Sequence, residues 1–187
     1  SGCGLETFVV EPTTPEVVTV MMLEDEEDTI IENNDMLERG VSVYDTALIS
    51  GQSDNATGTV TYQLFADALC TVPFADPYVV NLANGEIPDS NTMVIPDAGS
   101  YYWVVTYSGD DNNDAAVSGC GEEYFHVEMV SPSVTTTMRY ENGKLIENDD
   151  VVFTDNSVID TAVLVGATND ASGTATYQLF SDAACTV

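Results

Sequence analysis

The residues with the clearest chemical potential form a cluster of acidic and amide side chains within five consecutive positions. Their hard oxygen atoms are the ligands that Ca²⁺ prefers in proteins, and they belong to Asp110, Asp111, Asn113 and Asp114. The cluster departs from an EF-hand loop, because Ala115 and Gly121 stand where that loop requires glycine and glutamate. The pattern therefore makes Ca²⁺ a candidate ligand, outside any standard loop type.

A second acidic cluster occurs twice in the chain. Glu32 and Asp35 flank two asparagines, and Glu147 and Asp150 flank an asparagine and an aspartate at the matching place. A recurring cluster could be a cation site that stiffens the joint between neighbouring domains. The alternative for both clusters, which we favour, is a solvated turn in which Asp and Asn side chains bend the backbone.

Signals for catalysis are weak. The single histidine, His126, lies in a predicted strand, and no nucleophile elbow, phosphate loop, CxxC or HExxH motif accompanies it. Pairs of carboxylates carry little information, because some of the 32 acidic residues must be neighbours by chance. We therefore expect that the chain is not an enzyme.

Charge restricts the class of partner. The chain has 3 Lys and Arg against 32 Asp and Glu, a formal net charge of -29. Such a surface repels the phosphates of nucleic acids and anionic lipids, so we expect neither as a partner. No run of about 18 apolar residues occurs, which predicts no membrane span. The same charge keeps a long exposed fibre soluble.

The chain contains an internal repeat of about 115 residues. Residues 42–72 match residues 157–187 at 19 of 31 positions, and at a shift of 117 the opening SGCG matches residues 118–121. The change of shift has a local cause, since residues 23–28 are replaced by the shorter Tyr-Glu-Asn-Gly at 140–143. Asn-Gly between apolar runs predicts a tight hairpin with a type I′ turn.

The repeat defines the expected domains. Proline-containing stretches mark the linkers, so residues 1–11 are predicted to be the last strand of a preceding copy. Residues 12–130 form one complete copy, and residues 131–187 form the N-terminal half of a following copy. We expect the chain to be a window on a longer tandem array.

Strands must position the clusters described above. Residues 57–65 alternate between apolar and polar side chains, and residues 101–107 are rich in aromatic and β-branched types. Further strands are expected at 17–23, 41–49, 78–82 and 124–130, with polar turns between them. Short strands at this spacing predict an all-β fold of tandem β-sandwich domains, each of immunoglobulin-like size.

The repeat also restricts the cysteine pairing. Cys70 and Cys120 lie within the complete copy, whereas Cys3 and Cys185 are the repeat equivalents of Cys120 and Cys70. This logic predicts a Cys70–Cys120 disulfide, with the partners of Cys3 and Cys185 outside residues 1–187. The alternatives are a bond from Cys3 to Cys185 of a neighbouring chain, and four reduced thiols. Recurring cysteines in a turn-rich β chain favour an oxidising compartment.

Two stretches resemble the immunoglobulin-like tandem repeats of very large bacterial surface and secreted proteins. They are TGTVTYQLFADALCTV at 57–72 and YYWVVTYSGDDNNDAAVSGCGEE at 101–123, and the resemblance extends over the whole period. It implies an extracellular structural array, such as a stalk, fibre or adhesin spacer, with no catalytic residue to transfer. The acidity of the chain and its acidic turn at 24–28 depart from these repeats.

The expected function is structural. In the first hypothesis the copies form a stalk that projects a functional tip, and any cell-surface or host ligand binds a part outside this sequence. In the second, strands or half-domains at the chain ends complete a neighbouring copy and build a filament. A third option is a calcium-stiffened binding module at the cell surface. One glycosylation sequon, at Asn55, fits a secreted protein.

Overall fold

The structure, a computed structural model, describes residues 4, 6–83 and 85–186. The chain divides into two compact units, unit 1 (Ser1–Met129) and unit 2 (Val130–Val187). The described residues form strands and turns without a helix, so the predicted all-β class is confirmed. The division between the units falls beside the boundary that the repeat places at residue 130.

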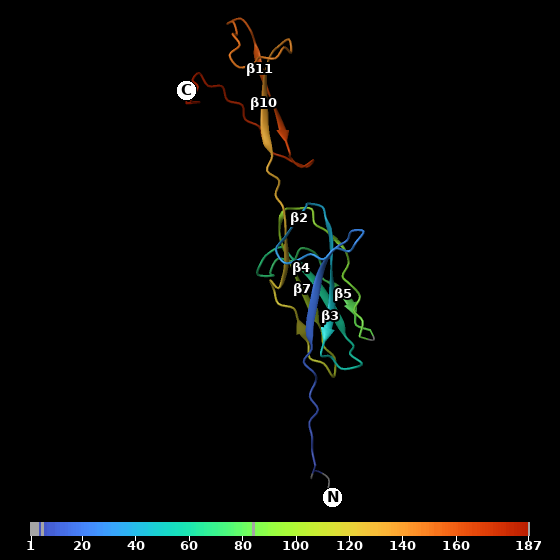
Figure 1. The fold of residues 1–187 in the computed structure, drawn as a ribbon. Helices are drawn as coiled ribbons and strands as arrows, with labels where there is room; N and C mark the ends of the chain where they lie inside the picture. The colour runs from blue at the N-terminus through green and yellow to red at the C-terminus, as the bar shows by residue number, and fades with distance from the viewer. Residues whose placement is uncertain (1–3, 5, 84, 187) are drawn as a thin grey trace. The chain divides into compact units, whose positions relative to one another are not determined.

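Unit 1 consists of two sheets that pack in a sandwich-like arrangement (Figure 1). The smaller sheet has the order β1-β3-β6 and contains Glu16–Leu23, Ser42–Ser50 and Met93–Val94. The larger sheet has the order β2-β9-β7-β4-β5, with β8 also paired to β7. Its strands are Asp35–Leu37, Glu123–Val127, Gly99–Tyr107, Thr59–Phe65 and Tyr78–Asn81, with Ala116–Val117 as β8. All pairs are antiparallel except β2 with β9.

The core of unit 1 lies between these sheets. Strand β4 alternates between buried and half-buried residues, and the buried set includes Tyr62 and Leu64 at 0% exposure. Strand β7 places Trp103, Val105 and Tyr107 on the same interior, also at 0%. The buried tyrosines keep their hydroxyls satisfied, since that of Tyr62 donates to the carbonyl of Pro88 at 3.1 Å.

Sequence periodicity located the long strands of unit 1. The six expected strands correspond to β1, β3, β4, β5, β7 and β9, each with bounds within about three residues of the expectation. The short strands β2, β6 and β8 were missed, because two or three residues are too few for a period to emerge.

A disulfide joins Cys70 to Cys120, the pair that the repeat predicted. It connects the turn after β4 to the turn before β9, with a Cα–Cα distance of 6.1 Å. Among the described residues, Cys185 is an exposed cysteine that forms no disulfide. Cys3 lies outside the described residues, so the predicted location of its partner stays a prediction.

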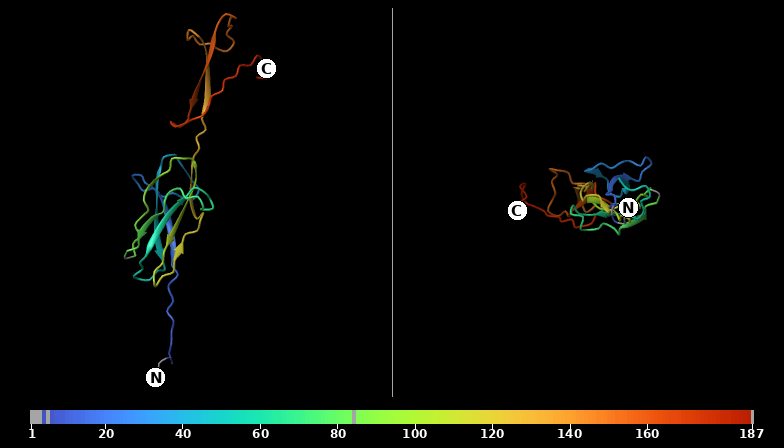
Figure 2. Two further views of the ribbon diagram at one scale, coloured as in Figure 1. Left: turned by 180° about the vertical axis from the view of Figure 1, so that it is seen from behind. Right: turned by 90° about the horizontal axis from the view of Figure 1, so that it is seen from below.

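Unit 2 repeats part of this architecture. Strands β10 (Ser133–Tyr140) and β11 (Val158–Val165) form an antiparallel pair. Their register reproduces that of β1 and β3, because Glu16 opposite Ser50 becomes Ser133 opposite Val165 after shifts of 117 and 115. Residues 174–180, which match β4, form no strand. The strands of this unit, among its described residues, are therefore β10 and β11 (Figure 2).

The turn after β10 corrects one prediction. A type I′ turn needs positive φ at Asn142 and at Gly143, but of these two only Gly143 has it, with φ of 85°. The amide of Gly143 donates to the carbonyl of Tyr140 at 2.8 Å, and the amide of Tyr140 donates to the carbonyl of Lys144 at 2.9 Å. This is a three-residue loop closed by a left-handed glycine, which places a single residue at positive φ.

Candidate functional site

The first acidic cluster forms a network of hydrogen bonds in unit 1, called the latch below, that joins residues 110–114 to Thr13, Ser53 and Thr57. The side chain of Asn113 is buried, and its Oδ1 accepts from Thr13 Oγ1 at 2.8 Å and from the amide of Ser53 at 2.7 Å. Its Nδ2 donates to Asp110 Oδ1 at 2.7 Å. Gly109 makes this turn possible, because its φ is 71° and a Cβ there would lie 2.6 Å from the Asn113 carbonyl oxygen.

Asp110 completes the latch. Its Oδ2 accepts from the backbone amide of Thr57 at 2.7 Å and its Oδ1 from the amide of Asn112 at 2.8 Å. These backbone donors lower the pKa of the Asp110 carboxyl, because they favour its charged form. Both carboxylate oxygens therefore already serve the fold, and a cation here would compete with protein donors. Asp114 Oδ2 accepts from Thr14 Oγ1 at 3.3 Å, and Asp111 is exposed.

The second acidic cluster forms the same turn in both units. The amide of Glu32 donates to Asp35 Oδ2 at 2.9 Å, and the amide of Glu147 donates to Asp150 Oδ2 at 3.0 Å. The third residue of each turn has positive φ, as Asp149 does at 70°. Within residues 4, 6–83 and 85–186, no group of three or more His, Cys, Asp and Glu is placed to hold a metal ion. Calcium binding stays a prediction, and the recurrence of this cluster has a backbone explanation.

His126 lies in a contact that the sequence did not reveal. Its Nδ1 is 2.8 Å from Ser100 Oγ, and its Nε2 is 3.2 Å from Asn34 Oδ1. Ser100 and His126 are register partners on neighbouring strands β7 and β9. The backbone amides around them belong to the sheet ladder, so they are poorly placed to stabilise an oxyanion. The contact is that of a cross-strand pair.

A buried carboxyl is the site that sequence reasoning missed. Asp45 of β3 has 0% exposure, and among the described residues neither of its carboxyl oxygens has a hydrogen-bond partner. Its backbone amide donates to Ser90 Oγ at 2.8 Å, and the amide of Ser90 donates back to the Asp45 carbonyl at 2.9 Å. Burial raises the pKa of the Asp45 carboxyl well above its usual value, and the nearby carboxyl of Glu123 raises it further.

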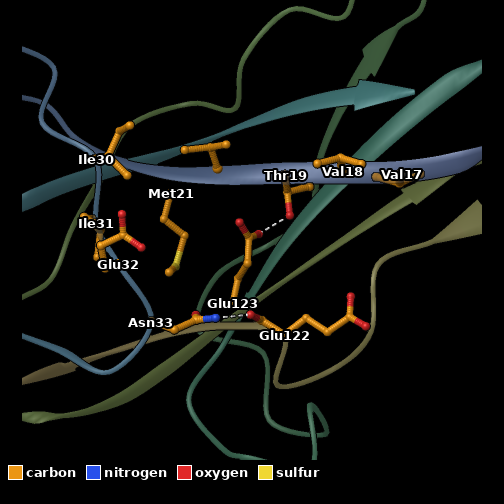
Figure 3. A pocket seen from close by; sticks show the side chains of 11 residues that line it. Val17, Val18, Thr19, Met21, Ile30, Ile31, Glu32, Asn33, Glu122 and Glu123 are labelled. Atoms are coloured by element: carbon orange, nitrogen blue, oxygen red, sulfur yellow. Dashed lines mark hydrogen bonds between the residues drawn. The ribbon is translucent and has the colours of Figure 1, made fainter. Parts of the chain in front are cut away.

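Glu123 of β9 faces the smaller sheet from the opposite layer. Its Oε2 accepts a hydrogen bond from Thr19 Oγ1 of β1, and Figure 3 shows the two side chains directed toward one another. Burial raises the pKa of Glu123, opposed by the bond from Thr19. The register partner of Glu123 is Trp103, whose indole Nε1 is buried without an acceptor among the described residues.

A groove opens beside this pair. It has a volume of about 520 Å³ and runs along β1, with the segment 30–33 and Glu122–Glu123 as its other walls. Figure 3 shows the side chains of Thr19 and Glu123 at this groove. The Thr19 hydroxyl and the Glu123 carboxyl thus meet at a groove that is open to solvent, and the buried carboxyl of Asp45 lies close enough to Glu123 for its pKa to respond.

Comparisons with known proteins add no identity. No protein-family model matches the chain, and no curated protein matches it significantly. The resemblance to immunoglobulin-like surface repeats therefore stays a prediction.

Two further predictions concern the surface. Asn55 is exposed in a turn, and the hydroxyl of its sequon residue Thr57 donates to Asp110 Oδ2 at 3.1 Å. Glycosylation at Asn55 stays a prediction. No helix in the described part of the chain is long and apolar enough to cross a membrane.

Proposed function

We propose that this chain is part of a structural, non-enzymatic repeat protein of the extracellular space, in which successive copies form a stalk, fibre or adhesin spacer. The observation that carries the proposal is the shared ladder of the two units, in which eight residue pairs of β1 and β3 recur in register in β10 and β11. A repeated unit with a repeated register is what an array of stacked domains requires.

The exposure of matching residues supports the same proposal. Tyr62 and Leu64 are 0% exposed in unit 1, whereas their equivalents Tyr177 and Leu179 are 54% and 88% exposed in unit 2. Apolar residues left open over a whole sheet face are costly in water. We infer that in the array these positions of unit 2 are covered by strands equivalent to β5–β9.

The filament alternative meets a structural obstacle. Residues 1–11 match the region of β9, so a second copy could supply that strand to unit 2. The pair would still lack an equivalent of residues 73–117, which contain the central strand β7 and Trp103. Strand addition by residues 1–11 alone would therefore leave the larger sheet of unit 2 interrupted at the position of β7.

An extracellular location agrees with the chemistry of the chain. The Cys70–Cys120 disulfide persists in oxidising compartments. The net charge of -29 favours an extended, soluble array, since like-charged neighbours repel one another. The partners that this proposal implies are neighbouring copies of the same repeat.

The experiment is a peptide map of the native protein, with and without reduction, by mass spectrometry. The stalk proposal predicts that Cys70 is linked to Cys120, and that Cys3 and Cys185 are linked to cysteines on peptides outside residues 1–187. A link from Cys3 to Cys185 would contradict it, because copies would then close on one another as subunits of a polymer.

A further inference from the structure

We propose that Thr19 and Glu123 form an intramolecular ester that joins the first strand of unit 1 to its last, with Asp45 as the proton carrier. The bond would be a self-made modification of the domain core, formed once for each copy. It does not depend on the proposed function, because the bond would exist in any protein that contains this unit.

The geometry places the reacting groups in contact. Thr19 is an inward residue of β1, and Glu123 is an inward residue of β9 in the facing sheet. The Thr19 hydroxyl donates directly to a carboxyl oxygen of Glu123, so its oxygen lies beside the carbon that it would attack (Figure 3). Holding two reactants in this way is worth effective molarities of about 10⁵–10⁸ M when the alignment is good.

Asp45 is the third member of the site. On the β1–β3 ladder Ala47 lies opposite Thr19 and Asp45 lies opposite Met21, so Asp45 is the diagonal neighbour of Thr19 on the inward face. Its side chain is fully buried, and neither carboxyl oxygen forms a hydrogen bond within the part of the chain that the structure describes. The titratable groups that face it from the opposite sheet are Glu123 and Tyr62, and Asp89 adds a weaker negative charge. These surroundings favour a protonated Asp45.

The reaction balances without an outside reagent. Thr19 Oγ1 attacks Cδ of the protonated Glu123 carboxyl, its proton passes to the carbonyl oxygen of the protonated Asp45, and the Asp45 O–H proton passes to the Glu123 carbonyl oxygen. In a second exchange Asp45 protonates one hydroxyl of the neutral tetrahedral intermediate and takes the proton of the other, the C–O bond to the protonated hydroxyl breaks, and water leaves. One ester and one water form from one alcohol and one acid, and Asp45 ends in its starting state.

The environment favours the product. Burial raises the pKa of the Glu123 carboxyl, and a neutral acid is the form that loses water rather than hydroxide. The groove along β1 gives the released water a path to solvent. The ester also removes the cost of keeping a carboxyl in a poorly hydrated interior.

All three residue types recur with the repeat. Thr136 is the equivalent of Thr19, Asp160 of Asp45, and Glu6 of Glu123. Asp160 and Thr136 are exposed in unit 2, where no equivalent of β9 is present to face them. The proposal therefore predicts one bond in residues 1–187, within unit 1. In a chain pulled at its ends, this bond would carry tension directly from β1 to β9.

The test is the intact mass of the full chain after denaturation and complete reduction of cysteines. The wild-type protein should weigh one water less than its sequence, a loss of about 18 Da. Thr19→Ala should weigh what its sequence requires, whereas Thr19→Ser should keep the loss because it keeps the hydroxyl. Thr136→Ala is the matched control, and it should lose water as the wild type does.

Further measurements separate the bond from a simple hydrogen bond. Glu123→Gln should reach the same final mass as the wild type, because its amide leaves as ammonia. Asp45→Asn should slow formation of the bond, with the Cys70–Cys120 disulfide and Trp103 emission confirming a folded variant. A wild-type mass equal to the sequence mass would overturn the proposal. So would a loss that persists in Thr19→Ala, since the bond would then lie elsewhere.

Discussion

Units 1 and 2 begin with the same ladder and differ in what covers it. Strands β1 and β3 pack against the larger sheet, so Val43 is 0% exposed, whereas its equivalent Val158 in β11 is 45% exposed. The registers are nonetheless identical. The pairing of β1 with β3, and of β10 with β11, is therefore encoded by the residues of these strands themselves. The burial of their inward side chains depends on strands that follow later in a copy.

The two copies of one aspartate show the same contrast in electrostatics. Asp45 is fully buried and its pKa is raised, whereas Asp160 is exposed on β11. Equivalent aspartates at equivalent positions of the ladder thus differ in burial, because a second sheet covers Asp45 and leaves Asp160 exposed. A set of matched substitutions can measure how much each unit depends on that sheet.

Removal of the disulfide should have the largest effect. Replacing Cys70 and Cys120 by serine frees a loop of 50 residues, and chain entropy predicts a loss of roughly 4 kcal/mol in the free energy of unfolding of unit 1. The measurement is guanidinium unfolding followed by the emission of Trp103, the single tryptophan. Cys185→Ser is the control, and it should leave the transition unchanged. Equal effects of both changes would contradict the contrast between a bonded and a free cysteine.

Truncation of matched leucines comes next. Leu64→Ala should lower the free energy of unfolding by about 3 kcal/mol, because it opens a cavity in a packed core. Leu179→Ala, at the equivalent and exposed position, should cost less than about 0.5 kcal/mol. Denaturant titration of both variants checks the pair. A large effect of Leu179→Ala would show that unit 2 has a core of its own.

Asp45→Asn should change how stability depends on pH. A carboxyl whose folded pKa lies above its ordinary value of 3.8 binds protons more tightly in the folded state. Stability from this group is therefore complete below about pH 3.8 and decreases as the pH rises toward the folded pKa. Each unit of elevation is worth about 1.4 kcal/mol.

The measurement for that change is the free energy of unfolding between pH 4 and pH 8. Relative to the wild type, Asp45→Asn should become progressively more stable as the pH rises. Asp160→Asn, at the exposed equivalent position, is the matched control for the substitution itself. Parallel curves for all three proteins would refute the buried, protonated state of Asp45.

Loss of the latch should have a smaller effect. Asp110→Ala removes acceptors for the amides of Thr57 and Asn112, so the melting temperature of unit 1 should decrease. The lowered pKa of Asp110 gives stability that is present above its ordinary value of 3.8 and is lost as the pH falls. The difference between variant and wild type should therefore shrink in acid. Asp111→Ala is the exposed neighbour and should melt as the wild type does.

The smallest effect should come from calcium. The oxygens of Asp110 already accept protein hydrogen bonds, and those of Asp35 and Asp150 close turns. We expect equal melting temperatures with millimolar calcium and with excess chelator. A melting temperature that increases with calcium in the wild type, but not in Asp110→Ala, would indicate a cation site at this cluster.

The long strands, the repeat and the disulfide pair could be predicted from the sequence, because alternation and self-similarity extend over many residues. The carboxyl site could not be predicted with the same means. Asp45 occupies an inward position between Val43 and Ile49, and this break in an apolar face was the available signal. The proximity of Asp45 and Glu123 depends on how the two sheets pack against each other. A local sequence pattern does not encode that packing. The sequence left two interpretations of the acidic clusters open, because turns and cation sites use the same residue types.

We propose that unit 2 is the first half of a copy like unit 1, and a protein built from this sequence alone can test it. A second copy of residues 73–130 is appended after Val187, and amide hydrogen exchange is followed at 133–140, 158–165 and 174–180. We expect slow exchange in all three segments, with Cys185 bonded to the appended equivalent of Cys120. Exchange as fast as in the parent chain, with Cys185 still a free thiol, would contradict it.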